Sequence, residues 1–121
     1  MLTFDQLRET NVTRCLDAFH YSIEEWSPTD WACALAGECG EACNLIKKLR
    51  RLEGQPLTPE IGVKRGELIR EVAHELADMI IYADLLAARL GISLTEAVTR
   101  KFNIVSERRG SAIRLPEEGD P

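Results

Sequence analysis

Apolar residues recur in this chain with the period of an α-helix, and nowhere do they alternate for long with polar residues. A helix places residues three and four apart on one face, whereas a strand places every second residue on one face. The helical pattern is fullest between residues 69 and 90, where isoleucine, leucine and alanine side chains fall into one stripe. The sequence therefore predicts an all-α fold of about four helices, without an internal repeat of the solenoid type.

Capping residues predict the ends of the first two helices. Thr3 and Gln6 have the spacing of a capping box, and the helix that they open is expected to reach about His20. A Ser-Pro pair at residues 27–28 supplies an N-cap followed by a proline at the first helical position, so a second helix is expected to begin there. Gly54 is expected to end it.

The last two helices are expected over residues 67–90 and from Ser93 to about residue 107. Ser93 begins a second capping box. The stretch 53–66 contains several glycines and prolines, so we interpret it as a loop with at most one short helical turn after Thr58.

Two of the predicted helices carry a pair of acids one helical turn apart, Glu38 with Glu41 and Glu75 with Asp78. Side chains three apart lie on one face with Cβ atoms roughly 5–6 Å apart, so each pair can direct two carboxylates at one ion. Glu38 falls inside the apolar stripe of its helix and Glu41 on the edge of that stripe. Because an unpaired buried carboxylate is costly, we interpret the four acids as ligands of a divalent metal.

On the third helix the acids belong to a second stripe beside the main apolar one. Glu71 precedes Glu75 and Asp78 in this stripe, and Tyr82 and Leu85 continue it. The main apolar stripe is expected to be buried, and the flank formed by Tyr82 and Leu85 to pack against another subunit. Glu71 is equally consistent with a role at the metal and with a position facing solvent.

Length and composition limit the class of protein. A chain of 121 residues suits one domain, which we place at residues 1–110 with a loose tail at 111–121. A net charge of −5 argues against binding to a nucleic-acid polymer. The lack of an apolar run of membrane-spanning length and of a leader predicts a cytoplasmic protein without membrane contact. The four cysteines contain no CxxC pair and are expected to be buried, reduced thiols.

A cluster of carboxylates favours hard cations. Mg²⁺ takes oxygen ligands at about 2.0–2.1 Å and keeps several of its waters, and Mn²⁺ is a possible substitute. Such ions would allow an acidic protein to bind phosphates, and one of them would activate a water. Glu38 and Glu41 are the candidate bases for that water, with no basis in the sequence for choosing between them.

Four segments together resemble the MazG-like branch of the all-α nucleoside triphosphate pyrophosphohydrolases over roughly residues 26–110. They are, in order, Glu38-Cys39-Gly40-Glu41, Glu75-Leu76-Ala77-Asp78, Lys101-Phe102-Asn103 and Arg108-Arg109-Gly110. The resemblance implies a four-helix bundle that assembles as a homodimer or homotetramer, with active sites near a subunit interface. It also implies a hydrolase that cleaves a nucleoside triphosphate between its α and β phosphates to give a monophosphate and pyrophosphate, a reaction suited to nucleotide-pool house-cleaning.

The resemblance further implies that Lys101, Asn103 and Arg108 bind the phosphates of the substrate. The alternative for these residues is a basic helix end favoured by the helix dipole.

Two other functions stay open on the sequence. Glu71 and His74 form an ExxH motif, and ferritin-like di-iron proteins combine such motifs with single glutamates in a helical bundle. Since this chain has one ExxH, a symmetric di-iron site would need two chains. The other possibility is a non-catalytic helical interaction module with the acids on its surface, which predicts neither metal dependence nor turnover.

Overall fold

The computed structural model describes residues 1–117, and these form four α-helices, one short 3-10 helix and no β-strand. The predicted all-α class is therefore confirmed. The elements are α1 (Phe4–Phe19), η1 (Ile23–Glu25), α2 (Pro28–Glu53), α3 (Pro59–Arg89) and α4 (Leu94–Arg108).

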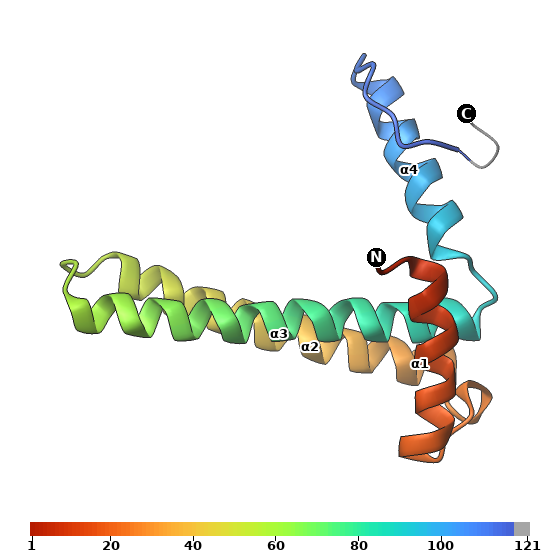
Figure 1. Cartoon of the computed structure of the whole chain (residues 1–121), viewed down its shortest axis with the longest axis horizontal. Coiled ribbons are helices and arrows are strands. Elements are labelled where there is room, and N and C mark those ends of the chain that lie inside the picture. The colour runs from red at the N-terminus through yellow and green to blue at the C-terminus, as the bar shows by residue number, and fades with distance from the viewer. Residues whose placement is uncertain (118–121) are drawn as a thin grey trace.

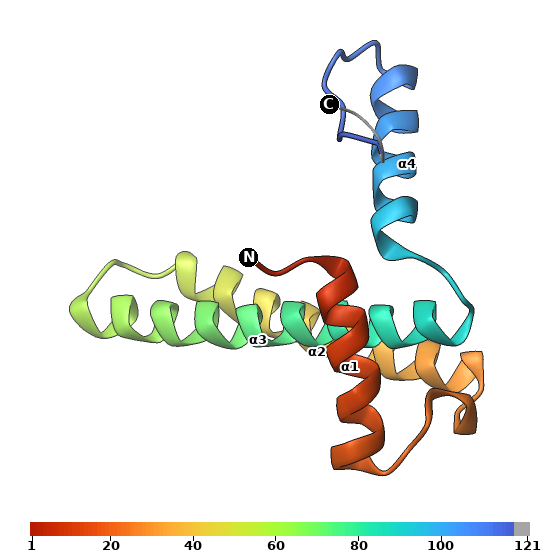
Figure 2. The same cartoon turned by 45° about the vertical axis from the view of Figure 1, so that its right-hand side comes forward.

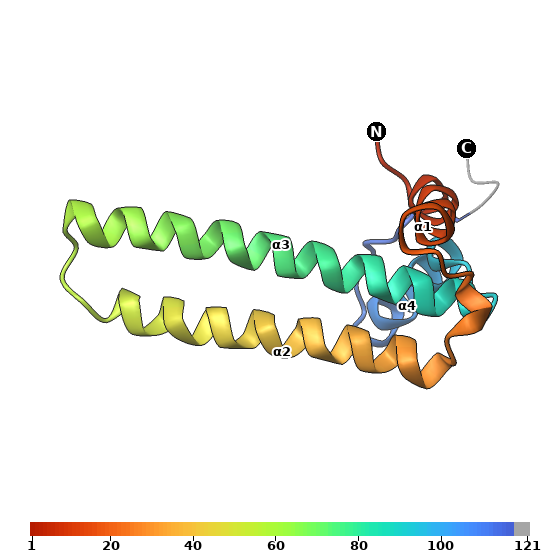
Figure 3. The same cartoon turned by 90° about the horizontal axis from the view of Figure 1, so that it is seen from below.

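A long antiparallel hairpin of α2 and α3 forms the body of the molecule (Figure 1, Figure 3). Helix α1 crosses α3 near the end of the hairpin that lies opposite the α2–α3 loop. Helix α4 leaves the same end and extends away from the hairpin, touching α1 near its base (Figure 2). Within residues 1–117, no helix combines the length and hydrophobicity that crossing a bilayer requires.

The predicted helix starts at Thr3 and Ser27 are confirmed by their hydrogen bonds. The Gln6 N–H donates to Thr3 Oγ1 over 3.1 Å, and the Thr3 N–H donates back to the Gln6 side chain over 3.0 Å. Ser27 caps α2 with Pro28 at its first position. Ser93 caps α4 by accepting the Glu96 N–H over 3.3 Å.

The predicted start of α3, at residue 67, was wrong. Residues 59–66 are not a loop but the first two turns of α3, and Thr58 is its N-cap, accepting the Ile61 N–H over 3.2 Å. Gly62 lies inside the helix, where glycine costs roughly 1 kcal/mol relative to alanine. Packing against α2 offsets that cost, because Ile61 and Leu68 are half-buried in the antiparallel pair.

The hydrophobic core lies where α1 and η1 meet the hairpin. Cys15, Trp31 and Leu85 are its buried members. The half-buried side chains packed around them are Ile23, Trp26, Tyr82 and Leu86. The Trp31 indole N–H donates to the Ile23 carbonyl over 3.0 Å, which ties η1 to α2.

A buried carboxylate fixes α1 to α3. Asp84 is fully inaccessible, and its Oδ1 accepts Arg8 Nε–H over 2.9 Å while its Oδ2 accepts the Asn11 amide over 3.1 Å. Arg8 also donates to the Ile92 carbonyl over 2.8 Å, in the segment that leads into α4. Arg8 of α1 thus links this helix to α3 and to the segment before α4.

The faces of α3 are used differently from the prediction. Leu85 is buried and Tyr82 half-buried within the chain, so the flank expected to contact another subunit is already covered. The stripe expected to be buried is instead partly open, since Ile69, Leu76 and Ile80 are 40%, 47% and 51% exposed. The error arose because amphipathicity identifies an apolar face but not the partner that covers it.

The expectation of buried thiols holds for one cysteine of four. Cys15 is buried, whereas Cys33, Cys39 and Cys43 are exposed on α2. All four are free, as predicted.

Residues after α4 fold back on that helix as far as the structure describes them. The Asn103 amide donates to the Leu115 carbonyl over 3.0 Å, and the Leu115 N–H donates to Asn103 Oδ1 over 2.8 Å. The tail expected to be loose therefore has one firm attachment at Leu115, and its last part, 118–121, lies outside the described residues.

Candidate metal centre

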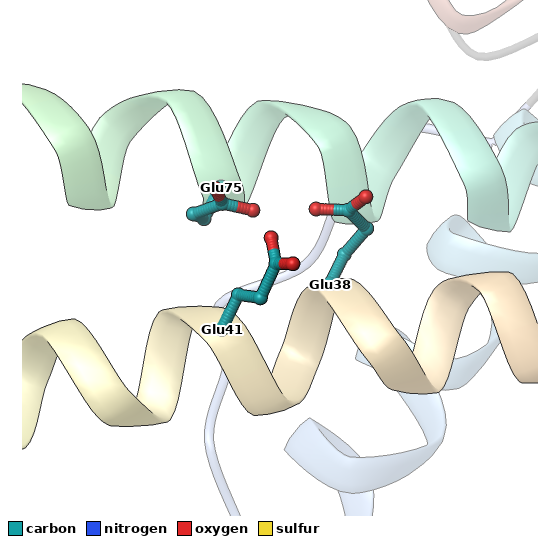
Figure 4. Close-up of side chains that lie close together, drawn as sticks. All are labelled: Glu38, Glu41 and Glu75. Carbon is teal, nitrogen blue, oxygen red and sulfur yellow. The ribbon is translucent and has the colours of Figure 1, made fainter.

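Three carboxylates from two helices converge in the middle of the hairpin. Glu38 and Glu41 lie on α2 and Glu75 on α3, and their side chains point toward one another (Figure 4). One oxygen from each lies within 4.8 Å of the other two. We call these three residues the acidic cluster. The structure thus brings together three of the four acids predicted as ligands.

The local sequence explains this convergence. Glu38 is half-buried and lies two turns after the buried Trp31, on the side of α2 that faces α3. Glu41 follows one turn later and is exposed, as expected from its place on the edge of the stripe. Because α3 runs antiparallel to α2 and packs along it, Glu75 meets both side chains across the helix interface.

Glu75 has the least favourable surroundings of the three. Its Oε2 is shielded from solvent and has no hydrogen-bond donor within residues 1–117. Ionised carboxylates offer only acceptors, so neighbouring acids cannot satisfy it unless one of them carries a proton. Within residues 1–117, no positive side chain forms an ion pair with the acidic cluster.

The electrostatics agree with this geometry. A hydrogen bond with Glu38, which requires a shared proton, raises the pKa of the Glu75 carboxyl. Burial and the negative charges of Glu38 and Asp78 act in the same direction, and a hydrogen bond with Glu41 opposes them. A bound cation would relieve this crowding by favouring the ionised forms.

Asp78 lies next to the acidic cluster rather than in it. It is half-buried one turn after Glu75, and its charge acts on Glu75 and on the Tyr82 phenol. Burial first, then the charges of Glu38 and Asp78, raise the pKa of Tyr82, which keeps its hydroxyl protonated as a donor. The role of Asp78 as a fourth ligand stays a prediction.

The donor set of the acidic cluster fits Mg²⁺ or Mn²⁺. All three side chains offer hard carboxylate oxygens, the ligands that these ions prefer. The shielded, unsatisfied Glu75 Oε2 is the kind of atom that a cation would complete. His74, which the di-iron alternative needs as a ligand, does not belong to the group of converging ligand atoms within the described chain.

A polar groove of about 320 Å³ adjoins the acidic cluster on the side of the α2–α3 loop. Its lining residues are Glu41, Asn44, Leu45, Lys48, Glu71, His74 and Glu75. The sequence offered a signal for two of them, because Asn44 and Lys48 follow Glu41 at three and seven residues and so share its face of the helix. Asn44 was nevertheless not among the predicted site residues.

The predicted phosphate-binding residues lie elsewhere in the chain. Lys101, Asn103 and Arg108 belong to α4, which extends away from the hairpin that carries the acids (Figure 1). The side-chain amide of Asn103 is already bonded to Leu115. Within one chain the structure does not bring these three residues to the acidic cluster.

Comparison with family models, with curated proteins and with solved structures found no match to this chain.

Proposed function

We propose that this protein is a Mg²⁺-dependent nucleoside triphosphate pyrophosphohydrolase, with Mn²⁺ as a possible substitute. The observation that carries the proposal is the convergence of Glu38, Glu41 and Glu75 within 4.8 Å of one another, with a shielded oxygen that has no donor within residues 1–117. The resemblance to MazG-like enzymes supplies the reaction, which is cleavage between the α and β phosphates. Triphosphates and Mg²⁺ occur together in the cytoplasm, where we place the activity.

In this proposal the carboxylates have two tasks. Glu38, Glu41 and Glu75, with Asp78 beside them, would hold the ion, which would supply positive charge that offsets the charge of the triphosphate. Glu38 or Glu41 accepts the proton of the attacking water. The water oxygen bonds to the α phosphorus, the bond from that phosphorus to the bridging oxygen breaks, and pyrophosphate leaves with the bonding electrons.

Product analysis tests the proposal directly. Purified protein is incubated with canonical, deoxy and modified triphosphates in the presence of Mg²⁺, Mn²⁺ or chelator, and products are separated by chromatography. We expect a monophosphate and pyrophosphate from at least one substrate, and no reaction with chelator. Release of orthophosphate and a diphosphate would contradict the assigned bond, and no turnover with any triphosphate would favour an interaction module.

We also propose that the protein acts as a homodimer or a homotetramer. Cys39 and Leu76 each directly follow an acid of the cluster, so both are rotated by the same amount from the contact between α2 and α3. In an antiparallel pair this places them on the same side of the hairpin. Ile46 and Ile80 extend that side and are about half exposed, at 47% and 51%. We call it the apolar hairpin face, and a second copy would cover it.

A further inference from the structure

The groove beside the acidic cluster contains a lysine that has no ionic partner in the described part of the chain. Lys48 lies two turns after Glu41 and lines the groove. The ion pairs within residues 1–117 join Arg8 to Asp84 and Arg65 to Glu53, so Lys48 belongs to none of them. Its ammonium group is therefore available to an anion that enters the groove.

On the opposite side of the acidic cluster the described hairpin carries one cation, Arg89 at the end of α3, and its Nε–H already donates to the Trp26 carbonyl over 3.0 Å. Between Arg89 and the carboxylates lie Trp31 of α2 and Tyr82 of α3, each two turns from an acid of the cluster, and both pack in the core. Their rings lie 6.4 Å apart between centroids and bring no positive charge to that side. Since Arg89 is already bonded to a backbone carbonyl, an anionic chain that reaches the carboxylates through bound metal would find its positive side chain, Lys48, on the side of the α2–α3 loop.

The hairpin also carries a net positive charge on the side of the groove. The part beyond the acidic cluster, residues 42–74, carries seven lysines and arginines against four glutamates, although the whole chain is acidic. This part includes the α2–α3 loop (Figure 3). A local positive field of this kind draws in polyanions and orients them before contact.

We propose that this groove holds the two phosphates that leave as pyrophosphate, with Lys48 as their charged contact and Asn44 as a hydrogen-bond donor. The inference rests on the proposed function and deepens it by giving the substrate a direction along α2. The nucleoside monophosphate then lies on the other side of the carboxylates. Because Glu41, Glu71 and Glu75 also line the groove, the ligand is the metal complex of pyrophosphate rather than the bare anion.

Calorimetric titration with inorganic pyrophosphate tests the groove without any turnover. The full chain, its Lys48→Gln variant and its Lys47→Gln variant are titrated in Mg²⁺ and in chelator. Lys47 is the matched control, because it is an exposed neighbour with the same charge that does not line the groove. We expect binding in Mg²⁺ only, weakened about tenfold or more by Lys48→Gln and at most about twofold by Lys47→Gln.

The outcomes separate this inference from the proposed function. Equal losses in the two lysine variants would show a diffuse field instead of a contact and would overturn the inference. Binding in chelator as tight as in Mg²⁺ would also overturn it. If a triphosphate is hydrolysed but Lys48→Gln changes neither its KM nor inhibition by pyrophosphate, the function stands and the inference fails. If nothing is hydrolysed yet pyrophosphate binding depends on Lys48, the function fails and the groove remains a site for metal-bound phosphates.

Discussion

The carboxyl of Glu75 couples the stability of the protein to pH and to metal. Its pKa in the folded chain lies above the ordinary value of 4.5, first because of the hydrogen bond with Glu38 and then because of burial. A carboxyl with a raised pKa binds its proton more tightly in the folded than in the unfolded state. Its contribution to stability is therefore present below the ordinary pKa and is lost as pH rises through the raised one.

Glu75→Gln should remove that dependence. Without metal, we expect the variant to melt at a higher temperature than the wild type at neutral pH, because the amide cannot ionise beside Glu38 and Asp78. The difference should shrink as pH falls through the raised pKa and should level off near 4.5, the ordinary glutamate pKa. Thermal melts from pH 4 to 8 in chelator measure it, and Mg²⁺ should stabilise the wild type only. A variant that melts below the wild type at neutral pH would contradict the crowding of negative charge.

Glu38→Gln and Asp78→Asn should each abolish most turnover while preserving the helical fold. Each change removes a charge that the proposed ion needs but hardly alters side-chain volume. Loss of an ion is worth several kcal/mol of transition-state stabilisation, so we expect a reduction of about a hundredfold or more. Steady-state kinetics and circular dichroism on the same samples measure both effects.

Glu67→Gln is the matched control for these two variants, because Glu67 is an exposed acid of α3 that lies outside the cluster and the groove. Its activity should be close to that of the wild type. Near-normal turnover in both Glu38→Gln and Asp78→Asn would exclude the assigned ligands.

At the scale of helices, local signals in the sequence located most ends but not the start of α3. Thr3, Ser27 and Ser93 cap helices where predicted, because capping depends on a few neighbouring residues. The glycines and prolines of residues 53–66 suggested a loop, yet Pro59 and Gly62 belong to α3. Pro59 is favoured at the first helical position after Thr58, and packing along α2, which is not encoded within the segment itself, overrides the low propensity of Gly62.

Some residues of the candidate site could also be predicted from local sequence, and others could not. Glu38, Glu41 and Glu75 were predictable, since their spacing on two helices already implied a shared face. The placement of Lys101, Asn103 and Arg108 depends on where α4 points, and no local pattern fixes that direction. Asn103 instead fastens the chain after α4 through both of its amide atoms.

Arg8→Met should loosen α1 from the hairpin. The change leaves Asp84 buried with its charge uncompensated apart from the Asn11 amide, and breaking a buried ion pair in this way costs about 3 kcal/mol or more. Urea denaturation measures the loss in the free energy of unfolding. Arg50→Met, at an exposed position of α2 without an ion pair in the described chain, should change it by less than about 0.5 kcal/mol. Equal losses would show that Asp84 does not depend on Arg8.

At the scale of the whole molecule, the hairpin leaves one broad side uncovered. Ile69, Leu76 and Ile80 are exposed on α3, and Ile46 on α2. A single layer of two helices cannot bury both of its faces, and α1 covers only the end where the core lies. In the proposed dimer or tetramer, a second copy would cover this apolar hairpin face.

Light scattering should report a dimer or a tetramer, and Leu76→Asp combined with Ile80→Asp should convert it to a monomer. Charged groups in the middle of an apolar interface would be buried without partners. Val63→Asp is the control, because Val63 is 62% exposed on α3 and is rotated away from this face. Its assembly should match the wild type. A wild-type monomer at micromolar concentration would contradict the interface while leaving the metal site untested by this measurement.

The topology of the hairpin also sets an order of events during folding. α2 and α3 are joined by a short connection, residues 54–58, whereas the contact between Arg8 and Asp84 joins positions 76 apart. Contacts close in sequence form sooner than distant ones, so the two acidic helices meet before α1 docks on them. The carboxylates thus repel one another at an early, partly formed stage, when little else holds the hairpin together. Mg²⁺ bound at that stage would relieve this repulsion. The proposed ion would then affect the rate of folding as well as the stability of the folded protein.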